Sequence, residues 1–127
     1  MEQRLDVVVT AVGGAAFIRP NGVLDIRGAA DFEHEILGAL RKRFAEIVVD
    51  LRGVSFIDSI GLRSLFRACG WCERQHIPLA VVGGDDSVQR LLRVTGADMW
   101  LPLVEDVPLR LRNGDPGGAR PEPVPNT

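Results

Sequence analysis

The chain has 127 residues, of which 46% are hydrophobic and 25% are charged, a composition typical of one soluble globular domain with its own core. Fifteen basic residues stand against seventeen acidic ones, and no block of like charge indicates a nucleic-acid partner. No apolar run is long enough for a signal peptide or a membrane span. We therefore expect a cytoplasmic protein without a nucleic-acid or membrane partner.

The first third of the chain predicts a hairpin followed by a helix. Residues 5–12 and 15–20 are rich in β-branched and apolar residues, and the two glycines at 13–14 fit a hairpin turn between them. A short extended piece is expected between Gly22 and Gly28. From Asp31 to Phe44 apolar residues recur at every fourth position, which predicts a helix with one buried face.

The next segments alternate between strand and helix patterns. A continuous apolar run at 46–51 predicts a strand covered on both faces, and apolar spacings of three, four and seven predict a second helix at about 59–74. A strand at 77–84, a short helix at 85–97 and a last strand at 99–104 follow. This order predicts an α/β domain with a mixed, mostly parallel β-sheet, an N-terminal hairpin and helices packed against the sheet.

The last part of the chain has a different composition. Residues 106–114 give only a doubtful helix, because Pro108 and alternating leucine and arginine weaken the pattern. Residues 114–127 are rich in proline and glycine and nearly devoid of apolar side chains. We expect a domain over residues 1–113 and a disordered tail over 114–127.

The segment FIDSIGL, residues 56–62, joins a strand region to the second helix, with Phe56 and Ile57 expected to anchor the loop. Asp58 or Ser59 then falls at or near the N-cap, and a capping role worth about 1 kcal/mol explains both residue types. Gly61, however, costs about 1 kcal/mol relative to alanine in a first helical turn. It allows another backbone or a bulky group to come close to the serine. Since helix N-termini also favour phosphate, Ser59 is a candidate modification site.

Two segments, IVVDLRGVSFIDSIGL (47–62) and GVLDIRGAADFEHEILGAL (22–40), resemble the STAS domain, and specifically the small bacterial anti-sigma factor antagonists. The resemblance covers roughly residues 5–107. It implies a mixed sheet with helices on one side, and a serine, Ser59, that is phosphorylated by a partner anti-sigma factor with serine-kinase activity. Asp58 matches the acid beside that serine. Asp25 matches a position that supports docking and phosphoryl transfer.

The resemblance implies a non-enzymatic role in transcription regulation by partner switching, typical of stress responses. The unmodified protein binds the kinase anti-sigma factor and frees a sigma factor, the phosphorylated protein lets go, and a serine phosphatase reverses the modification. Nucleotide binding then belongs to the kinase, so no cofactor is expected here. The chain departs from the family pattern at Ile60, where a second hydroxyl is common, and at Pro108, which breaks the usual long C-terminal helix.

Phosphorylation would add about 1.5 to 2 negative charges at position 59, which helix N–H groups and Arg63 can hold in the free protein. A partner surface shaped for a neutral hydroxyl would instead bury an unpaired charge. The outward face of the second helix is the expected partner surface, although a solvated basic face with a half-buried tryptophan explains the same residues. The predicted partner-binding residues are Ile60, Arg63, Ser64, Arg67 and Trp71.

Two enzyme interpretations of Ser59 and its surroundings are weaker. A hydrolase nucleophile elbow needs glycine where Ile57 stands, and only His34 and His76 could serve as its base. The glycines at 83–84 lack the spacing and the lysine of a nucleotide loop, so a turn between strand and helix is the better interpretation.

Cys69 and Cys72 have the Cys-x-x-Cys spacing of redox and zinc sites, with His76 four residues further on. Reactive thiols of that type lie at a helix N-terminus, whereas these lie about three turns into the second helix, and zinc would need a fourth ligand. Two cysteines are also too few for a disulfide framework. We expect free thiols, with Cys69 in the core.

A second functional class is compatible with the same resemblance. STAS-like domains also act as subunits of lipid-transport ATPase complexes or as scaffolds of stress-sensing assemblies, where the serine loop packs against a partner without being phosphorylated. Partner exchange when a kinase and ATP are added would distinguish the phosphorylation switch from the scaffold role.

Overall fold

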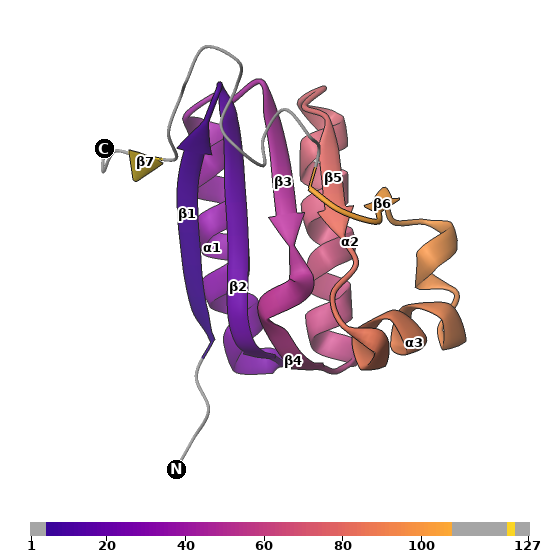
Figure 1. Ribbon diagram of the computed structural model, residues 1–127. Helices are drawn as coiled ribbons and strands as arrows, with labels where there is room; N and C mark the ends of the chain where they lie inside the picture. Colours follow the sequence, from indigo (N-terminus) through magenta and orange to yellow (C-terminus); the bar gives the residue numbers. More distant parts are fainter. Residues whose placement is uncertain (1–4, 108–121, 124–127) are drawn as a thin grey trace.

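A mixed β-sheet lies at the centre of the computed structural model, which describes residues 5–107 and 122–123 (Figure 1). The strands are β1 (Asp6–Val12), β2 (Ala15–Leu24), β3 (Glu46–Asp50), β4 (Val54–Ile57), β5 (Leu79–Val82), β6 (Leu103–Val104) and β7 (Glu122–Pro123). The helices are α1 (Ile26–Arg41), α2 (Ser59–Arg74) and α3 (Asp86–Val94), with short 3-10 turns η1 (Leu51–Gly53) and η2 (Ala97–Met99).

The strand order is β6-β5-β3-β2-β1-β7, and β4 pairs with the far end of β2. The β1–β2 hairpin and the β1–β7 pair are antiparallel, whereas β2–β3, β2–β4, β3–β5 and β5–β6 are parallel. This topology confirms the predicted fold class.

Strand β2 is longer than the predicted strand at 15–20. It pairs with β3 through Ala15–Ile18 and with β4 through Gly22–Leu24, and η1 separates the two partners. Pro20 lies in the gap between these two ladders, where a missing backbone N–H costs no parallel-ladder bond. A register irregularity follows at Gly22, whose φ of 115° favours glycine.

Helix α1 begins at Ile26, so the extended piece predicted between Gly22 and Gly28 is wrong from Ile26 on. The first turn buries no large apolar side chain, because Ile26 is exposed and the buried positions are Gly28 and Ala29. A Cβ on Gly28 would lie only 2.6 Å from the carbonyl oxygen of Val23, so the close approach of helix and strand requires a small residue there. The helix ends at Arg41, and Phe44 contacts the core from beyond it.

The last predicted strand is also shorter in the structure. Met99 belongs to η2, and only Leu103 and Val104 form β6. Of the predicted helix at 85–97, residues 86–94 are helical, and Gly96 has a left-handed backbone after the helix end. The doubtful helix at 106–114 and the tail from 114 lie outside the described residues, apart from residues 106–107 and the short strand β7.

Helices α1 and α2 cover one face of the sheet, as predicted (Figure 1). Ile47 and Val49 of β3 face this layer, and Phe32 and Leu65 are among the helical residues buried in it. Val48 points to the opposite face, in a smaller cluster closed by the segment after β6. All three β3 residues are fully buried, which confirms a strand covered on both faces. Within the described part of the chain, no helix has the length and apolar character needed to cross a membrane.

An ion pair between buried Asp50 and partly exposed Arg52 fixes the end of β3. The carboxylate of Asp50 is fully buried and accepts from the Arg52 backbone N–H, Nε and Nη2, each at 3.0 Å. Arg52 also contacts Asp106 at 3.3 Å, and its pKa is raised, chiefly by the hydrogen bonds to Asp50. The pair therefore connects η1, which leads into β4, to the segment that follows β6.

Candidate functional site

Three helices begin at the same end of the sheet, beyond the carboxyl ends of parallel strands (Figure 1). Each has an aspartate at its N-cap: Asp25 for α1, Asp58 for α2 and Asp85 for α3. The first two caps are neighbours, because Leu24 of β2 pairs with Ile57 of β4 directly before them. Two helix N-termini with their partial positive charge therefore lie side by side.

Asp58, and not Ser59, caps α2. Its Oδ1 accepts the backbone N–H of Gly61 at 2.9 Å, and Ser59 is the first helical residue. The side chain of Ser59 is exposed, and its hydroxyl has no hydrogen-bond partner among the described residues. The backbone N–H groups of Ser59 and Ile60 likewise have no partner within residues 5–107 and 122–123. The cap therefore leaves both the hydroxyl and two amide donors available.

Gly61 fixes the position of this loop. A Cβ on Gly61 would collide with the carbonyl oxygen of Leu24 and would lie 2.8 Å from its carbonyl carbon. The backbone N–H of Asp58 donates to that same oxygen at 3.3 Å. The close approach that glycine was expected to allow is therefore made by the β2 backbone, one residue before Asp25.

Asp25 is held by the helix that it caps. Its Oδ1 accepts the N–H groups of Arg27 and Gly28 at 3.0 and 3.1 Å, and the Arg27 guanidinium lies 3.9 Å from Oδ2. The Gly28 N–H is the main cause that lowers the pKa of this carboxyl, with smaller contributions from Arg27. Asp25 is therefore a carboxylate at neutral pH. It follows β2, which pairs directly with β4, the strand that leads to the Ser59 loop.

The predicted partner residues on α2 do not all lie on one exposed face. Arg63 is exposed and Ile60 is half-buried. Arg67 makes a 3.7 Å contact with Glu33 of α1 and lies 5.3 Å from the centre of the Trp71 ring. The half-buried Trp71 also packs against the core. Arg67 therefore connects α2 to α1, and Trp71 lies next to it.

The placement of Ser64 on the partner surface is wrong. Ser64 is fully buried, and its Oγ donates to the carbonyl oxygen of Gly61 at 2.6 Å. A serine can occupy the buried side of a helix when a carbonyl in the preceding turn accepts from its hydroxyl. Ser64 therefore belongs to the packing of α2 against the sheet.

Two exposed apolar side chains near the serine were not recognised in the sequence. Ile26, the first residue of α1, is highly exposed, and so is Phe56 on β4. The expectation that Phe56 anchors the loop is therefore wrong, while its neighbour Ile57 is buried. Ser55 and Phe56 are both exposed between buried Val54 and Ile57, and the pairing of β4 with β2 shifts register at this point, which interrupts simple strand alternation. Each exposed residue lies within two positions of an N-cap aspartate.

The histidines do not complete a hydrolase site with Ser59. His76 lies beyond the other end of α2, and a helix of 16 residues is about 24 Å long. His34 is exposed within α1. Neither position supports a general base next to the Ser59 hydroxyl.

The cysteines are free thiols inside α2, Cys69 half-buried and Cys72 buried. Burial is the main cause that raises the pKa of each thiol from 9.0 to about 11. A raised pKa opposes thiolate chemistry at neutral pH. Within the described ranges, no group of three histidine, cysteine or acidic side chains is placed to bind a metal ion.

These raised pKa values predict a pH dependence of stability. The unfolded thiols ionise near pH 9 while the folded ones hold their protons to about pH 11, so the free energy of unfolding contributed by them falls as the pH rises through this window. Thiolate absorbance should titrate with a midpoint near 11 in the native protein and near 9 in denaturant. Equal midpoints would contradict the burial of these thiols.

Comparisons with known proteins identify the family of this chain. The STAS domain family matches the sequence over residues 6–108. No curated protein matches it. An anti-sigma factor antagonist from Mycobacterium paratuberculosis has 22% identity, covers 81% of this chain and 87% of its own, and superposes with a TM-score of 0.70. A candidate anti-sigma factor antagonist from Thermotoga maritima gives 22% identity, 80% and 87% coverage, and a TM-score of 0.72.

A third similar structure is the Bacillus cell fate determinant SpoIIAA in its phosphorylated form, with 16% identity, 80% and 93% coverage, and a TM-score of 0.61. At these identities the likeness to solved structures is one of fold. The family match is independent of them and spans most of the chain. The protein therefore belongs to the STAS domain family.

Proposed function

We propose that the chain is an anti-sigma factor antagonist controlled by phosphorylation of Ser59. Unphosphorylated, it binds an anti-sigma factor that is a serine kinase and thereby frees a sigma factor in the cytoplasm. Phosphorylated, it releases that partner until a serine phosphatase restores the hydroxyl. The observation that carries this proposal is the exposed, unengaged hydroxyl of Ser59 at the N-terminus of α2.

The free protein can tolerate a phosphate at this position. The unpartnered N–H groups of Ser59 and Ile60 point toward the helix N-terminus, where the partial positive charge favours an anion. Arg63 is exposed one turn further on, and it has no ion-pair partner in the described part of the chain. These groups offset the repulsion from the carboxylate of Asp58.

The surroundings of Ser59 also suit protein recognition. Exposed Ile26 and Phe56 lie on the two neighbouring segments that lead to and from the N-caps. A kinase surface that covers these apolar side chains would bring its active site close to Ser59 at the neighbouring N-cap, and buried aromatic contacts of this kind commonly dominate binding energy. We assign Ile26 and Phe56, together with Ile60, Arg63, Arg67 and Trp71, to the partner surface.

The chemistry of the switch is supplied by other proteins. The kinase brings the nucleotide and transfers the phosphoryl group, while this chain supplies the acceptor hydroxyl and the local charge around it. Asp25, held as a carboxylate beside the Ser59 loop, is suited to orient the partner or a basic group of its active site. The role is therefore regulatory and non-enzymatic.

Mapping the phosphate tests the proposal directly. Incubation with each serine-kinase anti-sigma factor of the source organism and ATP, followed by mass spectrometry, is expected to place one phosphate on Ser59. Ser59→Ala should remain unmodified, while Ser55→Ala and Ser87→Ala, which remove other exposed serines, should be modified normally. Phosphate on Ser55 or Ser87 would contradict the assignment. Stable capture by an ATPase complex with no phosphate on Ser59 would favour the scaffold role instead.

A further inference from the structure

A second exposed apolar surface lies away from the N-cap aspartates, where α3 ends and η2 follows. Val94 is 75% exposed, Met99 80% and Trp100 79%. Tryptophan is rarely so accessible in a monomer, whereas it is enriched at the centres of protein interfaces. We call this surface, from Gln89 to Glu105 on α3, η2 and β6, the α3–η2 face.

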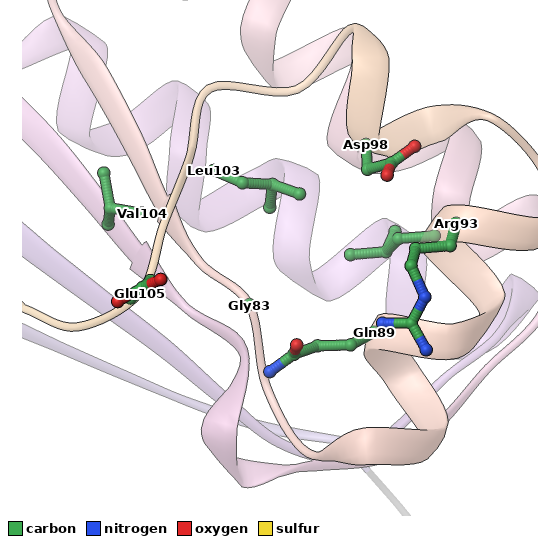
Figure 2. A pocket seen from close by; sticks show the side chains of 8 residues that line it. Gly83, Gln89, Arg93, Asp98, Leu103, Val104 and Glu105 are labelled. Carbon is green, nitrogen blue, oxygen red and sulfur yellow. The ribbon is translucent and has the colours of Figure 1, made fainter.

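The α3–η2 face is hollowed. A groove of about 490 Å³ lies between α3, η2 and β6 (Figure 2). Leu92, Leu103 and Val104 form its apolar part, and the rest of its side chains are polar or charged. Trp100 borders a second hollow, of about 370 Å³, on the side of α2. An exposed indole beside the smaller hollow offers both a projecting group and a recess, which one interface can use together.

The charges around these apolar groups are balanced and unpaired. Arg93, Asp98 and Glu105 line the groove, and Arg90 lies on α3 three residues before Arg93, so this segment carries two positive and two negative charges. None of the four forms an ion pair within the described residues. In Figure 2, Arg93 and Asp98 extend from α3 and η2 in different directions. Both signs of charge are therefore free to meet a partner.

We propose that the α3–η2 face binds a second copy of this chain in a two-fold symmetric dimer centred on Trp100. A two-fold interface uses the same patch on both partners, so the patch must complement itself. An apolar centre with equal numbers of unpaired positive and negative side chains meets that requirement. A strongly acidic or strongly basic partner would instead face like charges. The dimer does not depend on phosphorylation of Ser59.

Self-association and the environment of Trp100 can be followed together. The chain has two tryptophans, so the full-length Trp71→Phe variant leaves Trp100 as the only indole. Sedimentation velocity from low micromolar to submillimolar concentration should show a monomer–dimer equilibrium. The Trp100 emission should shift to the blue in step with dimer formation. A monomer at every concentration, or an emission that stays unchanged as dimers form, would overturn the proposal.

Substitutions identify the face. Trp100→Ser should weaken the dimer at least about tenfold, as expected for loss of a central aromatic contact. Val8→Thr is the matched control, because Val8 is an exposed apolar residue on β1, at the other side of the sheet from β6. It should leave the dimer unchanged. Equal weakening by both variants, or by neither, would overturn the assignment to the α3–η2 face.

Charge exchange tests the two-fold arrangement. A chain with Arg90→Glu and Arg93→Glu carries only negative charges at these four positions, and one with Asp98→Arg and Glu105→Arg carries only positive ones. Each should be monomeric alone, because its copies repel, and an equimolar mixture should form a heterodimer. All four positions are exposed, so far-UV circular dichroism should show unchanged folding. A mixture that stays monomeric would overturn the proposal.

Discussion

Phosphorylation of Ser59 is expected to weaken binding of the kinase anti-sigma factor at least about a hundredfold, which corresponds to about 2.7 kcal/mol. The modification adds about 1.5 to 2 negative charges at neutral pH. In the free protein, water, the amides of Ser59 and Ile60 and the nearby Arg63 hold that charge. A partner that covers Ile26 and Phe56 would remove the water, and the phosphate would be left beside Asp58 with the Asp25 N-cap as its neighbour. Burying such an unpaired charge costs several kcal/mol.

Titration calorimetry with the isolated partner measures this effect. Ser59→Ala should bind like the unmodified protein, because the loss of one exposed hydroxyl removes no contact on which the fold depends. Ser59→Asp should bind with intermediate affinity, since a carboxylate brings about one charge and not two. Ser87→Asp adds the same charge at the start of α3 and should have little effect. Indistinguishable dissociation constants for the unmodified and phosphorylated proteins would reject the electrostatic switch.

The sheet and the second helix could be predicted because their signals are local. Ile47, Val48 and Val49 form an unbroken apolar run, and all three are fully buried between two layers. The apolar spacing of α2 begins with the helix itself, so the predicted residues 59–74 agree with the observed bounds. Hydrophobic periodicity identifies an element well when large side chains mark its buried face from the first turn.

The start of α1 could not be read in this way. Its first buried positions are occupied by Gly28, which lies close to Val23 of β2 and to Leu5, and by Ala29, and neither carries a periodic signal. The Asp25 cap was the available indication, since aspartate is favoured immediately before a helix. Ser64 shows the converse problem. A polar residue looks exposed in the sequence, yet a carbonyl three residues earlier satisfies its hydroxyl inside the fold.

The candidate site was predictable to the extent that it is contiguous. Asp58, Ser59 and Gly61 lie within four positions, and their roles as cap, exposed hydroxyl and point of close approach follow from one helical turn. Asp25 is distant in sequence and was assigned through a family resemblance. The pairing of Leu24 with Ile57 gives its physical basis, because it brings the two N-caps together. The exposure of Phe56 depends on the register of β4, which sequence alone does not reveal.

Gly61→Ala is expected to lower the free energy of unfolding by about 3 kcal/mol and to slow phosphorylation of Ser59. Alanine favours a helix over glycine by about 1 kcal/mol, but its Cβ would overlap the Leu24 carbonyl group. That carbonyl cannot move freely, because it accepts from the Asp58 N–H and belongs to a residue paired with Ile57. The loop carrying Ser59 must therefore separate from the Asp25 cap.

Gly70→Ala in the same helix is the matched control. A Cβ at position 70 would find only the Arg74 Nη1 atom, at 3.7 Å, which is the end of a flexible side chain. This substitution should therefore raise the free energy of unfolding by up to about 1 kcal/mol and leave phosphorylation unchanged. Denaturant unfolding of both variants compares the same replacement in one helix with opposite expected signs. If Gly61→Ala were as stable as Gly70→Ala, the contact with Leu24 would not hold the serine loop in place, and the pairing of the two N-caps would lose its structural basis.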